Sequence, residues 1–294
     1  MKTATLGVWS LANFMSAADS AAFAQRVEQW SYSTLWVPEV MARDPMVTCS
    51  WLLAHTSRLN VATGIASIYA REPFAMQNAR YALAEQSAGR FLLGLGVSHA
   101  PFVEGAMGLK YGKPVATMRD YLERMNACQY LGPPPAEEPK TVLGAQGPRM
   151  LELAAAETDG AHPYNVTPDH TALAREILGR DKLLCPEQKV VLEIDPDIAR
   201  GIARKALAMA VTLRNYRNSF LRQGFATEDL ENGGSDKLID SIVVWGDEQA
   251  IRDRIQQHWD AGADQVCIQP LRRDPSKHSP DDEKILELLA PAND

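Results

Sequence analysis

The chain lacks the features that define several protein classes. It has only four cysteines among 294 residues, and no two of them form a C-x-x-C pair. Scattered thiols of this kind are typical of a reducing compartment and argue against a disulfide framework or a zinc site. No apolar run approaches the roughly 18 residues of a membrane span, and the amino terminus lacks a basic-then-apolar signal. We therefore expect a soluble, cytoplasmic protein.

A surplus of positive charge is also missing. The formal net charge is −7, which disfavours nucleic acid as a partner. The pair Gly94 and Gly96 lacks the third glycine of a dinucleotide fingerprint, and the chain contains neither H-E-x-x-H nor G-x-S-x-G. These absences argue against a Rossmann dinucleotide site, a metal site and a serine nucleophile.

Strand-like and helix-like segments alternate from end to end. Two apolar runs, Leu59–Ala66 and Phe91–Leu95, flank a segment that Pro73 opens and Gly89 closes. The runs show no clean alternation, as expected for strands that are buried on both faces of a parallel sheet. Proline suits the first turn of a helix and glycine its end. This stretch is therefore a predicted β-α-β unit.

The same pattern predicts eight strands over the whole chain. They are Thr3–Trp9, Thr34–Val37, Leu59–Ala66, Phe91–Leu95, Thr141–Leu143, Gly160–Ala161, Lys189–Ile194 and Val266–Gln269. Further helices are expected over Ser16–Trp30, Pro45–Thr56, Thr117–Tyr130 and Pro148–Thr158, from near Asp197, and from Asp247 to Trp259. We predict one α/β domain over residues 1–294, a closed (β/α)8 TIM barrel, with a doubly wound open sheet as the alternative. A helical insertion is expected over Arg214–Ser241, near the C-terminal strands, where it would cover one barrel end.

Candidate functional residues follow the predicted strands. Two glycine-bearing exits, Thr63–Ser67 and Gly94–His99, lie side by side, and ligands of α/β folds bind at this end. A flat ligand against bare backbone is the interpretation we favour. His99 and Glu39 each come just past a strand, so both are candidate catalytic groups for acid–base work.

Aromatic residues stand at or near other strand ends. Trp9 and Trp36 are candidates for substrate contact, since aromatic rings stack on planar ligands, although Trp36 also fits a core position. Tyr164, after the predicted strand Gly160–Ala161, can likewise stack on a planar ligand. His162 follows the same strand and has a standing similar to that of His99 as a titratable group.

A phosphate-binding turn is predicted at Gly144–Arg149. It joins a strand to a helix with Pro148 at the first helical position, so free backbone amides and the helix dipole converge there. Arg149 adds a positive charge. An ordinary strand-to-helix turn, with Arg149 paired to Glu152, is the alternative.

Several loose motifs, in order, resemble the bacterial luciferase-like superfamily. They are Leu35–Glu39, Thr63–Ile65, Gly89–Phe91 with Gly94–Gly96, and Ala156–Gly160. A closer similarity, to actinobacterial oxidoreductases that use coenzyme F-420 (8-hydroxy-5-deazaflavin), lies in Asp159–Pro168, Asn215–Asn218 and Gly233–Asp236.

The resemblance implies a barrel that holds the deazaflavin, or alternatively FMN, at the carboxyl ends of its strands. A non-proline cis peptide is expected to back the ring at Gly64-Ile65, and a homodimer is expected. The implied cofactor-binding residues are Gly64, Ile65, Ala66, Gly96, Val97, Gln146, Gly147, Pro148, Arg149, His162 and Tyr164.

The chain departs from that family at the proton-handling positions. Val40 stands where characterised deazaflavin dehydrogenases carry a histidine, and His99 stands where they carry a glutamate. We expect hydride transfer between coenzyme F-420 and a small organic substrate, because the cofactor carries the redox chemistry. An FMN-dependent monooxygenase and a barrel that binds a flavin without turnover remain alternatives.

Overall fold

The computed structural model describes residues 5–271 and 280–291. All strand pairs in these ranges are parallel. The strands are β1 (Thr5–Trp9), β2 (Thr34–Val37), β3 (Asn60–Thr63), β4 (Ala66–Ser67), β5 (Phe91–Gly96), β6 (Thr141–Leu143), β7 (Gly160–Ala161), β8 (Leu183–Leu184), β9 (Glu187–Leu192), β10 (Val243–Gly246) and β11 (Gln265–Pro270).

The strands curl into a barrel. Their order in the sheet is β10-β9-β11-β1-β2-β3-β5-β6-β7-β8, so β8 and β9, which follow each other in the chain, stand near opposite ends of the order. Leu183 N donates to Asp159 O beside β7 at 2.8 Å, and Asp264 N beside β11 donates to Leu184 O at 2.9 Å. The segment 183–192 thus lies between β7 and β11 and closes the ring, which confirms the predicted TIM-barrel class.

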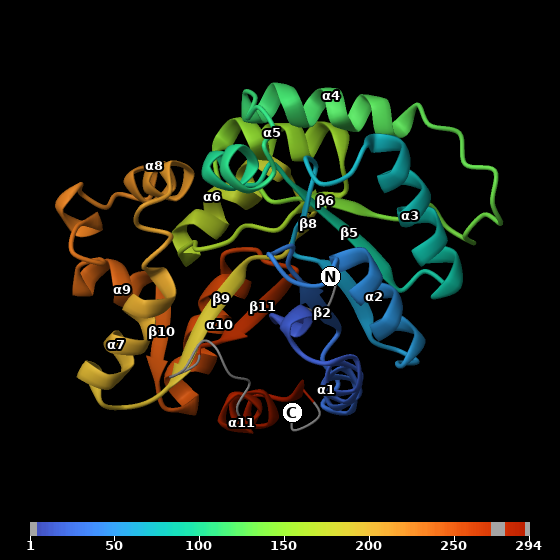
Figure 1. The fold of residues 1–294 in the computed structure, drawn as a ribbon. Coiled ribbons are helices and arrows are strands. Elements are labelled where there is room, and N and C mark those ends of the chain that lie inside the picture. The colour runs from blue at the N-terminus through green and yellow to red at the C-terminus, as the bar shows by residue number, and fades with distance from the viewer. Residues whose placement is uncertain (1–4, 272–279, 292–294) are drawn as a thin grey trace.

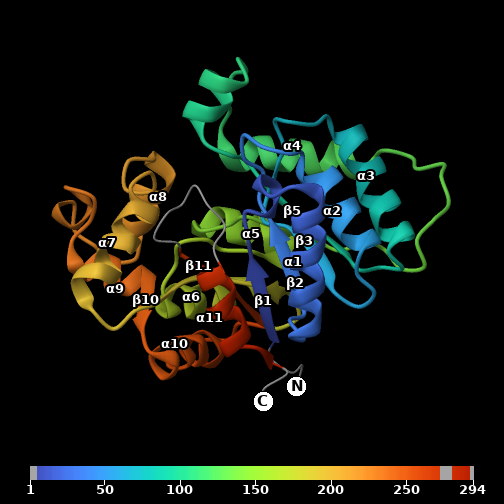
Figure 2. The same cartoon turned by 60° about the horizontal axis from the view of Figure 1, so that its bottom comes forward.

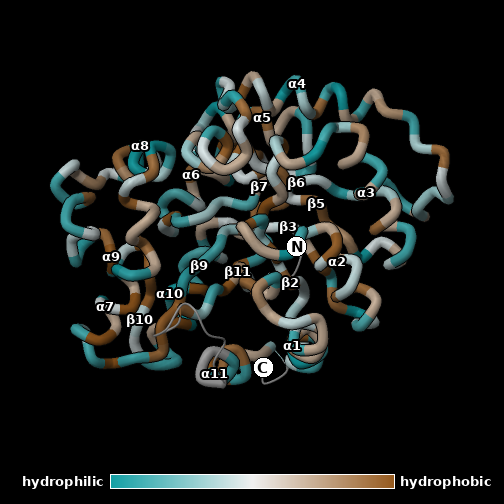
Figure 3. The backbone as a smooth tube through the Cα atoms, viewed as in Figure 1, coloured by the Kyte–Doolittle hydropathy of each residue, from teal (hydrophilic) through white to brown (hydrophobic). Residues whose placement is uncertain are grey.

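Helices cover the outside of the strands (Figures 1 and 2). Their outer faces are polar, as on α4 (Figure 3), while Trp36, Leu93 and Leu143 of the strands are fully buried. The helices are α1 (Ala17–Gln29), α2 (Pro45–Ala54), α3 (Pro73–Gln86), α4 (Pro114–Asn126), α5 (Pro148–Glu157), α6 (Pro168–Leu178), α7 (Pro196–Leu207), α8 (Arg214–Arg222), α9 (Asp236–Ile242), α10 (Glu248–Asp260) and α11 (Pro280–Leu288), with short turns η1 (Ala12–Phe14), η2 (Pro101–Ala106) and η3 (Glu228–Leu230).

Some boundaries differ from the sequence prediction. The run Leu59–Ala66 divides into β3 and β4, and the predicted strand Lys189–Ile194 begins two residues earlier, at Glu187. The helix predicted over Thr117–Tyr130 begins at Pro114 and ends at Asn126. Strands β8 and β10 and helices α6 and α11 were not predicted. The first two residues of the predicted strand Thr3–Trp9 lie outside the described residues.

The predicted insertion between Arg214 and Ser241 is confirmed as helical. It contains α8, η3 and most of α9. Together with α7 it stands beside the barrel on the side of β10 (Figure 1). Within the described ranges, no helix combines the length and the apolar character needed to span a membrane.

Candidate functional site

A bulge between β3 and β4 forms one wall at the carboxyl ends of the barrel strands, which we call the mouth. The peptide bond between Gly64 and Ile65 is cis, as expected. Trp9 Nε1 donates to Gly64 O at 2.9 Å, and the Glu39 amide donates to Ile65 O at 3.0 Å. The two carbonyls that flank this bond are therefore held by β1 and by the end of β2.

The Ile65 side chain lies over glycines of two neighbouring strand exits. A Cβ added at Gly96 would come within 2.4 Å of Ile65 Cδ1, and one at Gly144 within 3.2 Å of Ile65 Cγ2. Gly94 lies still closer to backbone, because a Cβ there would stand 2.0 Å from Thr63 O. These glycines leave room for the bulge, and the Ile65 side chain covers the backbone at Gly96 and Gly144. Ala66 is fully buried in β4, and Val97 packs half-buried beside β5.

Gly94 gives a direct test of this packing. We expect Gly94→Ala to destabilise the fold by about 1–3 kcal/mol or more, because the new methyl group collides with a backbone oxygen that cannot rotate away. The matched control is Gly201→Ala in α7, where a Cβ meets nothing within 4 Å. A helix-interior alanine there should stabilise by roughly 0.5–1 kcal/mol. Urea unfolding of both variants measures the difference, and equal midpoints would contradict the packing described.

His99 lies at the mouth with a fixed tautomer. Its Nδ1 is 2.7 Å from Asn215 Oδ1 of α8, an oxygen that only accepts, so the proton resides on Nδ1. The ring also contacts Tyr216 at a centroid distance of 5.1 Å. Burial lowers the pKa of His99 from its ordinary value of 6.5. A neutral imidazole with its Nε2 lone pair free is suited to accept a proton.

Glu39 is held in an ion pair. Arg71 Nη1 lies 2.9 Å from both carboxylate oxygens, and the Ser67 amide donates to Oε2 at 2.6 Å. Arg71 also bonds Asp44 at the start of α2. Both carboxylate oxygens of Glu39 are therefore engaged within the protein. The geometry favours a role for Glu39 in positioning the bulge, since Ser67 belongs to β4.

Two arginines without a partner among the described residues lie at the predicted phosphate turn, one within it and one beside it. Gly147 caps α5 without a side-chain bond, and Pro148 begins the helix. Arg149 is exposed and has no hydrogen bond or ion pair among the described residues. It therefore does not form the alternative pair with Glu152. Arg222 of α8, which sequence reasoning missed, stands 3.4 Å from the position of a Gly147 Cβ. It likewise has no partner in the described part of the chain, and burial lowers its pKa.

Gln146 connects this turn to the next strand exit. Its side-chain amide donates to Tyr164 O, and its backbone oxygen lies 2.7 Å from His170 Nε2. The turn is therefore held from α6 and from the loop after β7. At the start of α5, Pro148 carries no amide hydrogen, and the Met150 and Leu151 amides both donate to Gly147 O at 3.0 Å.

His162 and Trp36 lie beneath the mouth. His162 is 2 % exposed and stacks on Trp36 at a centroid distance of 4.2 Å. Its Nδ1 is 2.7 Å from Cys185 O, whereas the buried Nε2 has no partner and lies 3.1 Å from the position of a Gly64 Cβ. Burial lowers the pKa of His162 to about 4. Trp36 has no exposed surface, so the structure assigns it to the core and corrects its proposed contact with substrate.

Tyr164 belongs to a buried polar network that the sequence did not reveal. Its hydroxyl donates to Gln269 Oε1 at 2.9 Å, and its ring packs against Trp9 at 5.2 Å. Lys189 Nζ lies 3.7 Å from the centre of the Tyr164 ring. That ammonium donates to Asn165 Oδ1 at 2.6 Å and to both Glu187 oxygens at 3.1 Å. Burial raises the pKa of Glu187 and lowers that of Lys189.

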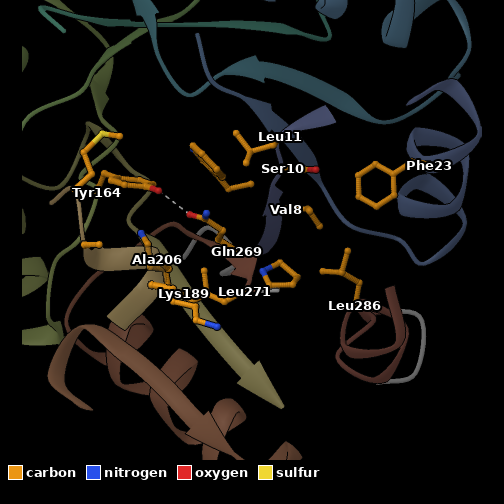
Figure 4. A pocket seen from close by; sticks show the side chains of 15 residues that line it. Val8, Ser10, Leu11, Phe23, Tyr164, Lys189, Ala206, Gln269, Leu271 and Leu286 are labelled. Atoms are coloured by element: carbon orange, nitrogen blue, oxygen red, sulfur yellow. Dashed lines mark hydrogen bonds between the residues drawn. The ribbon is translucent and has the colours of Figure 1, made fainter. Parts of the chain in front are cut away.

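A cavity of about 500 Å³ opens beside this network, over β1, β9 and β11 and against α7 (Figure 4). It shares Trp9 and Tyr164 with the predicted site. Ile65, His99 and Arg149 lie outside it. The predicted residues therefore divide into the bulge and His99 at the mouth, the phosphate turn at α5, and two aromatic residues at the cavity.

The comparisons with known proteins agree with this architecture. A family model described as luciferase-like monooxygenase matches residues 3–265. A Mycobacterium tuberculosis protein, provisionally named as a coenzyme F-420-dependent oxidoreductase, is 24 % identical over 90 % of this chain and 93 % of its own length. A 5,10-methylenetetrahydromethanopterin reductase of Methanolobus tindarius is also 24 % identical, over 92 % of this chain and 93 % of its own.

Solved structures with low sequence identity share the fold. An F-420-dependent secondary alcohol dehydrogenase in complex with an F-420–acetone adduct superposes with a TM-score of 0.76 at 14 % identity, covering 99 % of both chains. The oxygenating constituent of 3,6-diketocamphane monooxygenase from Pseudomonas putida, in complex with FMN, gives 0.68 at 12 % identity over 98 % of both chains. With the family match over most of its length, the chain belongs to the luciferase-like monooxygenase family.

Proposed function

We propose that the protein is an oxidoreductase that transfers hydride between coenzyme F-420 and a small organic substrate. One observation carries the proposal: the bulge with Ile65 over Gly96 and Gly144 makes a backbone wall at the mouth. The turn before α5, with two unpaired arginines, supplies a separate place for a phosphate. A flat ring with a phosphorylated tail fits this pair of features. The full-length relatives named for F-420 support the choice of cofactor.

The residues have distinct proposed roles. The bound deazaflavin supplies the hydride chemistry, and the protein orients it. Gly64, Ile65, Ala66, Gly96 and Val97 would form the surface for its ring. Gln146, Gly147, Pro148 and Arg149, joined by Arg222, would hold the phosphate. His162 and Tyr164 would line the inner end of the ring site, and His99 would exchange a proton with the substrate. Trp9 would face the substrate.

Arginine substitutions test the phosphate turn. We expect Arg149→Ala and Arg222→Ala each to weaken F-420 binding by about 1–3 kcal/mol, the range for losing a charge-assisted hydrogen bond. Arg180→Ala is the matched control, since Arg180 is exposed in the turn after α6 and is not part of the phosphate turn. Quenching of F-420 fluorescence measures the affinities. Unchanged affinity in both variants would make the turn an ordinary connection.

An FMN-dependent monooxygenase is the second candidate, favoured by the FMN-containing structure of the same fold. Fluorescence titration with F-420 and FMN in parallel separates the two, and tight binding of FMN alone would overturn the first. Stopped-flow oxidation of reduced cofactor by candidate acceptors then separates an enzyme from a barrel that binds without turnover.

We propose further that the chain works in the cytoplasm and forms a homodimer through α2. Val47 and Trp51 of α2 are 60 % and 38 % exposed, and Met41 just before the helix is 78 % exposed. Apolar side chains gathered on one helix favour burial against a partner. Analytical ultracentrifugation of the chain and of Val47→Glu tests this. A monomer at micromolar concentration would contradict the proposal.

A further inference from the structure

The cavity beside the barrel mouth has an apolar lining and few free polar groups. Ten of its fifteen lining residues are apolar, and none is acidic. In Figure 4, Tyr164 lies on one side of the cavity and Phe23 on the other, and Gln269 lies next to Tyr164. A volume of about 500 Å³ falls in the range of sites for small molecules.

The charged groups near the cavity do not select a charged ligand. The Lys189 ammonium, which has only three protons, is engaged by Glu187 and Asn165 and by the Tyr164 ring. Lys205 is exposed on α7, so water screens its charge. A carboxylate at the inner end would lose its hydration without gaining a cation, and an amine would find no free carboxylate.

Gln269 presents one fixed hydrogen-bond donor. Its Oε1 accepts from the Tyr164 hydroxyl at 2.9 Å, which sets the orientation of the amide. The Nε2 group then has no partner among the described residues, although the side chain lines the cavity. The donor is held by Tyr164, and Tyr164 is held in turn by Trp9 and Lys189. A ligand oxygen that accepts from Nε2 would complete the network.

We infer that this cavity is a small-molecule site beside the mouth and that it takes an uncharged, mainly apolar carbonyl compound, or the alcohol related to it. The ligand oxygen bonds Gln269 Nε2, and the apolar body lies against Leu11, Met209 and Leu271. Use of this ligand as substrate rests on the proposed function and is a step separate from binding, because His99 and Ile65 lie outside the cavity. Binding itself does not depend on the cofactor.

The test is isothermal titration calorimetry on the protein without cofactor. The probes are 2-heptanone, heptanoate and heptylamine, which share a chain length and differ in charge. We expect 2-heptanone to bind at least 10-fold more tightly than either charged probe. Tighter binding of heptanoate would mean that Lys205 recognises a carboxylate, and it would overturn the inference that the ligand is uncharged. No binding of any probe would overturn the site.

Three variants locate the binding. Gln269→Glu keeps an acceptor for the Tyr164 hydroxyl and removes the donor, so it should weaken 2-heptanone about 3- to 10-fold or more. Ala206→Phe fills the cavity from α7 and should abolish binding. Ile198→Phe lies on the same helix outside the cavity and should leave binding unchanged. Equal affinity in Ala206→Phe and the parent protein would overturn the location.

F-420 titration of the same samples separates this inference from the proposed function. If F-420 binds and the ketone does not, the pocket assignment fails while the cofactor assignment stands. If the ketone binds and F-420 does not, the cavity is a binding site but the hydride-transfer function fails. Circular dichroism of each variant excludes misfolding as the cause of lost binding.

Discussion

Replacing His99 by alanine is expected to lower turnover by about 100-fold or more while leaving F-420 affinity nearly unchanged. The Nε2 of His99 has no partner among the described residues, whereas its Nδ1 is bound to Asn215 and the Glu39 carboxylate is bound to Arg71. Loss of a general acid or base costs about 10²- to 10⁴-fold. Steady-state kinetics, paired with F-420 titration, measure the two effects separately. Wild-type turnover in His99→Ala would remove this residue from the mechanism.

The pH profile distinguishes catalysis from packing at His99. Burial lowers its pKa below 6.5, so the neutral, proton-accepting form predominates at pH 7. In the direction that oxidises an alcohol, kcat/KM should fall as pH drops through this lowered pKa, and the acid limb should vanish in His99→Ala. Asn215→Ala should shift the pH at which this acid limb falls, because it removes the hydrogen-bond partner of His99 Nδ1. Asn218→Ala, one turn further along α8, is the control and should leave the profile intact.

The barrel was predictable because its strands and helix starts carry strong local signals. Strands β2, β6 and β7 occupy the predicted residues, since short apolar runs between turns have few alternatives. Helix α6 was missed although Thr167 and Pro168 repeat the cap-and-proline pattern of Asp195 and Pro196. Strand β10 was missed because it follows α9 directly, with no turn residue between Ile242 and Val243 to mark a new element.

The site was less predictable because its polar residues depend on distant partners. Glu187, Gln188 and Lys189 are 1–2 % exposed, whereas a hydropathy pattern places such residues at the surface or outside a strand. Gln188 bonds His258 of α10, and Lys189 bonds Asn165 from the preceding loop. Arg222 reaches the α5 turn across 75 residues of sequence, and no local motif indicates that approach.

The same distance effect applies to Glu39, a candidate acid–base group whose ion-pair partner the sequence does not reveal. Its position just past β2 was identified correctly. Its partner Arg71, however, lies after β4, in a segment without a motif. Position at a strand exit therefore predicts access to the mouth. Availability of a proton acceptor depends on ion pairs that only the folded chain reveals.

Acid should unfold the protein through two buried histidines. Burial lowers the pKa of His258 to about 3 and that of His162 to about 4. Both side chains carry a proton in the unfolded chain below pH 6.5 but stay neutral in the folded one. Their contribution to stability is thus complete above pH 6.5 and is lost as the pH falls towards 4 and 3. Below pH 6.5, each histidine lowers the free energy of unfolding by about 1.4 kcal/mol per pH unit.

Between pH 7.5 and 5 the two histidines together should remove about 4 kcal/mol, a large share of a typical stability of roughly 5–15 kcal/mol. His258→Gln isolates one of them. His258 bonds Thr171 Oγ1 at 2.8 Å and Gln188 Oε1 at 3.0 Å, so the variant loses some stability at every pH. Its dependence on pH, however, should flatten by about 1.4 kcal/mol per unit. The raised pKa of Glu187 opposes the acid effect equally in both proteins and cancels from the comparison. Urea unfolding at pH 7.5, 6.5, 5.5 and 5.0 measures the two curves, and parallel curves would show that His258 titrates normally in the folded chain.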